Sequence, residues 1–333
     1  MAAIAIIICA AVVTALLIIW LRPWLVRYAM ARPNARSSHK IPTPQGGGIA
    51  IVAAWIVVSS AALTMSGWPA NPVSNILVVF AATVLIAVLG AADDIRPIEV
   101  IPRLFFQFVA VGTVIAILPS DFQMTPFLPW WLERALLVFA GVWFVNLVNF
   151  MDGLDWMTVA EMVPVAGGLV VLGLMGALPA YAAMCALALL GALAGFAPFN
   201  KPVARLFLGD VGSLPLGLIV GWLLALLANK GHLAAALLLP LYYLMDATIT
   251  LLRRLSNGER VWQAHRSHFY QRATDNGFTV KEVVAHVFGI NIVLAGLALA
   301  CVRFNTPIVE TIALAAGIII VTWLLIRFSR KHA

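Results

Sequence analysis

The chain has 333 residues, of which 63% are hydrophobic and only 11% are charged, and its mean hydropathy is +1.00. These values lie far outside the averages of soluble proteins and exclude an ordinary water-soluble domain. The net charge of +7 needs no nucleic-acid partner, because basic loops that face anionic lipid account for it. We predict an all-α polytopic membrane protein, with residues 1–333 forming a single integral membrane domain.

Apolar runs follow one another along the chain and are separated by short polar breaks. A run of roughly 20 apolar residues crosses the hydrocarbon core of a bilayer, and inside lipid such a run must be helical. The sequence therefore predicts about eleven transmembrane helices. They lie near 2–21, 46–66, 73–92, 104–119, 133–150, 157–176, 180–196, 211–229, 233–252, 283–302 and 308–326.

The basic residues predict how these helices are oriented. With eleven spans, all but three of the 21 Lys and Arg residues fall on one side, the exceptions being Arg134, Lys230 and Arg303. The positive-inside rule places that side and the C-terminus in the cytoplasm, and the N-terminus outside. Five carboxylates lie in breaks on the same side, so an enzyme at the membrane–cytosol boundary is the leading interpretation. They are Asp93, Asp94, Asp152, Asp155 and Asp210.

The first break on this side contains Lys40 and ends in three glycines, Gly46 to Gly48, directly before the second span. Glycines at a helix start expose backbone N–H groups at the positive end of the helix dipole, which suits a phosphate. Close packing between helices would also explain them, and the sequence leaves both interpretations open.

The third span ends in two adjacent acids, Asp93 and Asp94. Ionised groups at the end of a long apolar run are costly and are usually functional. Such a pair can share a metal, or one carboxylate can act as a base beside a cation. The alternative is a solvated helix end that these acids cap.

Polar residues then recur at every third position of an apolar background, as Asn146, Asn149, Asp152 and Asp155. On an ideal helix each step of three residues drifts by about 60°, so the four side chains would fan over half the circumference. A helix that opens at Gly153 would allow them to converge on one ligand.

Two further breaks carry candidate ligands. Asp210 lies between two glycines at the start of a span, where it suits a hard cation that needs oxygen ligands, and Phe207 could stack on a base or act as an anchor. The longest break, 253–282, combines arginines with two close histidines and suits an anionic ligand. Its candidates are Arg260, His265, Arg266 and His268. Thr279 and Glu282 then form a capping box for the next span.

Taken in order, the runs D-D, N-x-x-N-x-x-D-G-L-D and F-L-G-D-V-G-S resemble the polyprenyl-phosphate N-acetylhexosamine-1-phosphate transferases. Members of that family move a sugar-1-phosphate from a UDP-sugar to a phosphorylated polyprenol, release UMP and use Mg²⁺. The resemblance covers essentially the whole chain. It implies a UDP-N-acetylhexosamine and undecaprenyl phosphate as substrates, and a multi-pass protein of the bacterial inner membrane with its active site facing the cytoplasm. It leaves a homodimer open.

The resemblance also implies roles for individual residues. Asp210 matches the magnesium-binding aspartate, and Asp93 and Asp94 match an acidic pair that activates the lipid phosphate or helps to hold the metal. Lys40 resembles the lysine that precedes the second span. Residues that line the uridine and diphosphate site are matched by Asn146, Asn149, Asp152, Asp155 and, stacking on uracil, Phe207. Both direct attack by the lipid phosphate and a covalent aspartyl intermediate remain open.

The sequence departs from the motifs of this family at two places, and these departures indicate which branch of the family it resembles. Arg96 stands where the family usually has lysine, which keeps the charge but changes its geometry. The run H-R-S-H-F-Y-Q-R lacks the adjacent histidines of the phospho-N-acetylmuramoyl-pentapeptide transferases. We therefore expect the branch that initiates O-antigen or another surface polysaccharide, using N-acetylglucosamine or a 6-deoxy sugar such as N-acetylfucosamine or N-acetylquinovosamine.

Three alternatives remain. The peptidoglycan transferase is one, and a prenyltransferase with aspartate-rich motifs is another, although Asp93 and Asp94 lack the third acid that such motifs need. A secondary transporter is the third, and it should carry ionisable groups near the bilayer midplane. Glu161 and Asp246 are the candidates for such groups.

Overall fold

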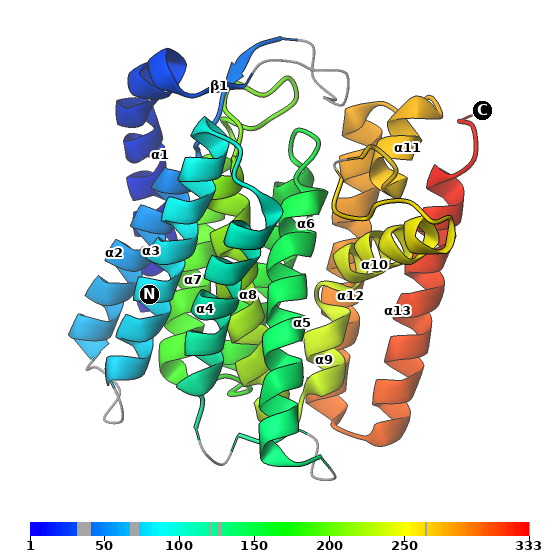
Figure 1. Cartoon of the computed structure of the whole chain (residues 1–333). Coiled ribbons are helices and arrows are strands. Elements are labelled where there is room, and N and C mark those ends of the chain that lie inside the picture. Colours follow the sequence, from blue (N-terminus) through cyan, green and yellow to red (C-terminus); the bar gives the residue numbers. More distant parts are fainter. Residues whose placement is uncertain (32–40, 67–72, 120–121, 125–127, 264, 333) are drawn as a thin grey trace.

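Helices make up almost all of the ordered structure, which confirms the predicted all-α class (Figure 1). The computed structural model describes residues 1–31, 41–66, 73–119, 122–124, 128–263 and 265–332. Its helices are α1 (Ala2–Tyr28), α2 (Gly48–Ser66), α3 (Val73–Ile95), α4 (Val100–Ala116), α5 (Trp130–Met151), α6 (Met157–Leu174), α7 (Ala180–Phe196), α8 (Asp210–Asn229), α9 (Leu233–Leu238), α10 (Leu241–Ser256), α11 (Phe269–Asp275), α12 (Val280–Phe304) and α13 (Pro307–Phe328).

Within the described residues, eight helices are long and apolar enough to cross a membrane, and α4 and α7 are shorter apolar helices. Each of these ten coincides with one of the predicted runs. The protein is therefore a multi-pass membrane protein whose polar breaks lie where the sequence predicts them.

The prediction of one continuous span over 233–252 is wrong. That run forms two helices, α9 and α10, which are separated at Leu239 and Pro240. Proline lacks the N–H that a helix interior needs and clashes with the preceding turn, so the chain bends there. In Figure 1, α10 lies across the long axes of its neighbours α12 and α13 instead of running along them. The apolar composition on both sides of Pro240 conceals this bend in the sequence.

Helix α8 occupies the centre of the bundle and packs against α2, α3, α5 and α9. Small residues permit these contacts. A Cβ on Gly48 would lie 2.1 Å from the Cα of Gly212, and a Cβ on Gly90 would lie 2.3 Å from the carbonyl oxygen of Asp210. The hydrophobic effect does not drive helices together inside lipid, because the lipid tails are as apolar as the helix side chains. Helices there associate through close packing of this kind. The glycines therefore fix how α2 and α3 meet the start of α8.

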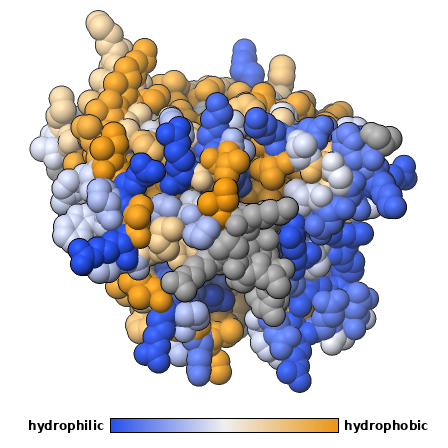
Figure 2. Space-filling view, turned by 90° about the horizontal axis from the view of Figure 1, so that it is seen from above, coloured by the Kyte–Doolittle hydropathy of each residue, from blue (hydrophilic) through white to orange (hydrophobic). Residues whose placement is uncertain are grey.

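The breaks that carry the sequence motifs meet at one end of the bundle (Figure 1). Strands β1 (Met30–Ala31) and β2 (Thr43–Pro44) pair antiparallel at this end, with Met30 opposite Pro44. Figure 2 looks down on it and shows hydrophilic side chains over much of the face. The C-terminus lies at the same end, as the eleven-span prediction requires (Figure 1).

Candidate functional site

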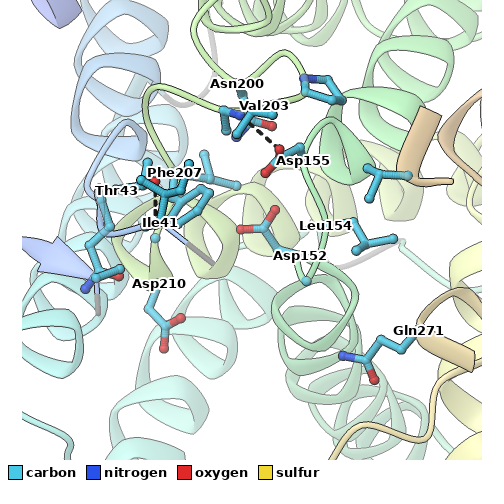
Figure 3. A pocket seen from close by; sticks show the side chains of 18 of the residues that line it. Ile41, Thr43, Asp152, Leu154, Asp155, Asn200, Val203, Phe207, Asp210 and Gln271 are labelled. Atoms are coloured by element: carbon cyan, nitrogen blue, oxygen red, sulfur yellow. Dashed lines mark hydrogen bonds between the residues drawn. The ribbon is translucent and has the colours of Figure 1, made fainter. Parts of the chain in front are cut away.

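A pocket of about 820 Å³ opens between the polar breaks at this end of the bundle (Figure 3). It is bounded by β2, the end of α3, the turn after α5, the loop before α8, and the segment from α11 to α12. The predicted site residues that line it are Asp94, Asp152, Asp155, Phe207 and Asp210. Predicted site residues from three separate breaks thus share one cavity.

Asp94 links the end of α3 to the start of α8. Its Oδ1 accepts a hydrogen bond from the backbone N–H of Asp210 at 3.0 Å, and its Oδ2 accepts one from Val211 at 3.1 Å. The first N–H groups of a helix have no partner inside the helix, so a side chain of α3 supplies the cap that α8 lacks. The side chain of Gln45 donates to the carbonyl oxygen of Asp94 at 2.9 Å and ties β2 to the same point.

Asn149 reaches Asp210 from α5, as a converging motif requires. Its Nδ2 donates to Oδ1 of Asp210 at 2.7 Å and to the hydroxyl of Ser213 at 2.9 Å. The Asp210 carboxylate is therefore held by one side chain of α5, while its backbone N–H is held by α3.

Asp93 points to a different partner. Its Oδ2 forms an ion pair with Arg103 at 3.1 Å, and its Oδ1 accepts from the N–H of Ile98 at 2.6 Å. These contacts close the turn between α3 and α4, and Asp93 does not line the pocket. Of the D-D pair, only Asp94 lines the described pocket, although the Asp93 side chain also interacts with that of Asp210.

Asp152 and Asp155 lie in the turn that follows α5. Thr158 donates to Oδ1 of Asp152 at 2.5 Å, and the N–H of Ala204 donates to Oδ2 of Asp155 at 2.9 Å. Withdrawal from water is the main cause that raises the pKa of Asp152 to about 7; the bond from Thr158 opposes this shift, and the neighbouring carboxylates Asp94 and Asp155 contribute to it. The pocket thus brings several carboxyl groups close together.

Not every predicted residue reaches the cavity. Asn146 is buried one turn deeper in α5, where its amide donates to the side chain of Gln107 at 2.6 Å and to the carbonyl of Val142 at 2.8 Å. The expected convergence of all four polar residues is therefore wrong for Asn146, because α5 stays regular up to Met151. Lys40 lies outside the described residues.

The structure does not support a phosphate site at the backbone N–H groups of Gly46 to Gly48. The N–H groups of Gly46 and Gly47 donate to the carbonyl of Phe207, at 3.2 and 2.9 Å, and Gly48 donates to Leu208 at 2.9 Å. These amides anchor the loop before α8 and are not available to a ligand. The contact does, however, hold Phe207 at the wall of the pocket (Figure 3).

The histidine-containing loop folds onto itself instead of lining the pocket. His268 pairs with the buried Asp246 of α10, at 3.2 Å, and Arg266 pairs with Asp275 at 3.2 Å. Arg260 is exposed and offers its carbonyl to Arg254. Burial, and then the nearby His268, lower the pKa of His265 to about 4, so this ring is neutral near pH 7. None of these four side chains lines the pocket, and their role in substrate binding stays a prediction.

Part of this sequence matches the model of a known protein family. The family model described as glycosyl transferase family 4 matches residues 76–228, which contain every carboxylate of the pocket. Over this stretch the chain is similar to glycosyl transferase family 4.

Several relatives are similar to this chain along most of their length. A probable undecaprenyl-phosphate N-acetylglucosaminyl 1-phosphate transferase of Bacillus subtilis is 26% identical over 80% of this chain and 75% of its own. A decaprenyl-phosphate N-acetylglucosaminephosphotransferase of Mycolicibacterium smegmatis is 25% identical over 93% of this chain and 86% of its own. A phospho-N-acetylmuramoyl-pentapeptide-transferase of Deinococcus radiodurans is 27% identical over 66% and 73%.

The pocket also contains residues that the sequence did not indicate as candidates. Asn200 accepts from the N–H of Trp156 at 2.8 Å and donates to the carbonyl of Leu206 at 2.9 Å, so it braces the turn after α5. Gln271 and Lys281 line the pocket from α11 and α12. Asn200 lies two residues from both Pro198 and Pro202 in a polar break, which was the available signal for it, whereas Gln271 and Lys281 carried none.

A hard divalent cation fits the donor set of this pocket. Asp94 and Asp210 provide carboxylate oxygens next to one another, and Asp152 adds a third carboxylate nearby. Within the described residues, no group of three or more His, Cys, Asp or Glu side chains forms a complete metal cage. Mg²⁺ requires no such cage, because it usually binds through one or two carboxylates and retains water or phosphate oxygens.

Proposed function

We propose that the protein transfers an N-acetylhexosamine-1-phosphate from a UDP-sugar to undecaprenyl phosphate, with release of UMP. The observation that carries this proposal is the pocket itself, where four acids from three breaks meet at the end of a membrane bundle. A lipid phosphate lies at the headgroup level, so a site at the ends of membrane helices is where a lipid acceptor and a water-soluble donor can meet. The matched relatives supply the substrate classes.

Each half of the pocket suits one part of the donor. Phe207 presents a ring at the wall, where a pyrimidine base could stack, and Asp155 lies close by in the same view (Figure 3). Asp210 lies on the other side of Asp152 in that view, and Asp94 accepts from the backbone N–H of Asp210. These two acids suit the diphosphate with its metal. We assign the nucleotide to the first group and the transferred phosphate to the second.

Mg²⁺ would be held by Asp210, with Asp94 and Asp152 as neighbours. When bound, it would neutralise phosphate charge and polarise the bond that breaks. Asn149 holds the Asp210 carboxyl, and Asp94 accepts from the Asp210 backbone N–H, before any substrate arrives. Positioning of this kind is the main contribution that a protein makes to phosphoryl transfer.

The metal assignment predicts the effect of one substitution. Asp210→Asn should reduce transfer to background, because an amide is a poor substitute for a carboxylate on Mg²⁺. The variant should still fold, since its amide can accept the bond from Asn149. We would measure UMP release together with chromatographic behaviour in detergent. Full turnover in EDTA, or an active variant, would contradict the assignment.

The direct test of the proposed reaction is UMP release by the purified protein from a panel of UDP-sugars, with and without undecaprenyl phosphate. We expect release only when lipid and Mg²⁺ are both present. A 6-deoxy N-acetylhexosamine or N-acetylglucosamine should be the best donor if the protein initiates O-antigen or another surface polysaccharide at the cytoplasmic face of the inner membrane. Preference for the UDP-N-acetylmuramoyl pentapeptide would instead favour the peptidoglycan reaction of the Deinococcus relative.

A further inference from the structure

Lys281 is the one cation among the described residues that line the pocket. It lies in the first turn of α12, and its side chain is exposed. The described lining also contains four carboxylates, which are Asp94, Asp152, Asp155 and Asp210. Two polyanionic substrates must enter this acidic cavity in the proposed reaction, so a positive group within it has a clear electrostatic use.

The ammonium group of Lys281 is not used to stabilise the fold. Within the described residues it has no carboxylate within ion-pair distance. The adjacent Glu282 is engaged elsewhere, because its carboxylate accepts from the N–H of Thr279 at 2.8 Å and lies 3.6 Å from His332. Lys281 is therefore available to a ligand.

Several other basic side chains near this end have partners of their own. Arg103 binds Asp93, and Arg254 binds Glu259. The guanidinium groups of Arg253 and Arg272 lie over the ring of Phe269, at 5.3 and 6.0 Å from its centre. None of these arginines lines the pocket, so they cannot replace Lys281 there.

The backbone that carries Lys281 is held firmly. Thr279 and Glu282 form the predicted capping box, and the side chain of Asn276 donates to the carbonyl of Phe328 at 2.7 Å. The N–H of His332 donates back to Asn276 at 2.8 Å, so the C-terminal segment fixes the turn before α12. A lysine in the first turn opposes the helix dipole, which makes the position unfavourable for stability alone.

Gln271 lies on the same side of the pocket. A Cβ added to Gly153 would come within 3.2 Å of its Nε2, so the amide lies over the turn that carries Asp152. In Figure 3, Asp152 lies between Gln271 and Asp210. The α11–α12 segment thus provides a polar wall facing the acids.

We propose that Lys281 binds a phosphate group of a substrate, either the diphosphate of the nucleotide-sugar donor or the phosphate of the lipid acceptor. This inference rests on the proposed transfer reaction and adds a residue to it. A compact ammonium with three donors suits a phosphate oxygen, and the contact is a charge-assisted hydrogen bond. The two sources of phosphate are separated by experiment.

The first test compares Lys281→Gln and Lys281→Arg with the control Lys201→Gln. Lys201 is an exposed lysine next to the pocket residue Pro202, but it does not line the cavity. For Lys281→Gln we expect a KM increase of about tenfold for one substrate, since a hydrogen bond to a charged group is worth about that much. Turnover at saturation should change little, and arginine should recover most of the loss. A higher KM for the UDP-sugar, with weaker inhibition by UMP, would identify the diphosphate, and a higher KM for undecaprenyl phosphate would identify the acceptor.

A second test does not depend on turnover. Thermal stabilisation in detergent with Mg²⁺ would be measured with inorganic pyrophosphate and with inorganic phosphate. We expect stabilisation of the wild type and of Lys201→Gln, and its loss in Lys281→Gln. If the wild type releases no UMP but this pattern holds, the phosphate site stands and the transfer reaction is wrong. Unchanged KM values for both substrates, or unchanged stabilisation by both anions in Lys281→Gln, would overturn the proposal.

Discussion

At the scale of single residues, the acids of the pocket have different structural tasks. Asp94 caps α8, so Asp94→Ala would leave the N–H groups of Asp210 and Val211 without partners. A buried donor that loses its partner costs about 1–3 kcal/mol. Asp94→Asn keeps an acceptor oxygen, and we expect it to be more stable than Asp94→Ala by about that amount. Thermal denaturation in detergent without Mg²⁺ would show the difference, and equal stability of the two variants would mean that the cap is unimportant.

Asp152 should respond to pH in the opposite sense from a stabilising acid. Its pKa in the folded protein, about 7, lies above the ordinary value of 3.8, so folding favours the protonated form. Its contribution to stability is therefore present at low pH and is lost as pH rises from about 4 to about 7. Asp152→Asn should match the wild type near pH 4 and exceed it at pH 8 in EDTA. Parallel stability curves for the two proteins across this range would contradict the prediction.

At the scale of helices, close contacts replace hydrophobic attraction. A Cβ on Gly90 would meet the carbonyl oxygen of Asp210 at 2.3 Å, whereas a Cβ on Gly112 would meet nothing within 4 Å. Alanine favours a helix over glycine by about 1 kcal/mol, so Gly112→Ala in α4 should be neutral or stabilising. Gly90→Ala in α3 should instead destabilise by about 1–3 kcal/mol and displace the start of α8. Melting temperatures and UMP release of the two variants provide the measurement, and equal tolerance would show that α3 and α8 can separate at little cost.

At the scale of the whole molecule, every functional inference requires the motif-bearing loops to face the cytoplasm. Single cysteines at Ser256 and Ser329, in a protein without its three native cysteines, should resist impermeant thiol reagents in intact cells. A cysteine at Asn305, in the turn between α12 and α13, should be labelled from outside. External labelling at Ser256 would reverse the orientation and separate the pocket from cytosolic UDP-sugar.

The sequence by itself determined the membrane class, ten of the helices and the set of breaks that carry the chemistry, because these follow from local composition. It also identified Asp94, Asp152, Asp155, Phe207 and Asp210, which line one pocket. The motif spacing is visible along the chain, and acids at the ends of apolar runs are rarely there by chance.

Only the tertiary structure decided which polar groups face the pocket. Asp93 and Asp94 are adjacent in sequence, but one pairs with Arg103 while the other caps α8. His268 is committed to Asp246, 22 residues earlier, whereas Lys281 is left open to the cavity. Partners of this kind depend on how distant helices pack, and a glycine contact between two backbones leaves no periodic trace in the sequence. The bend at Pro240 is a local signal, but its consequence, a helix lying across α12 and α13, arises only from packing.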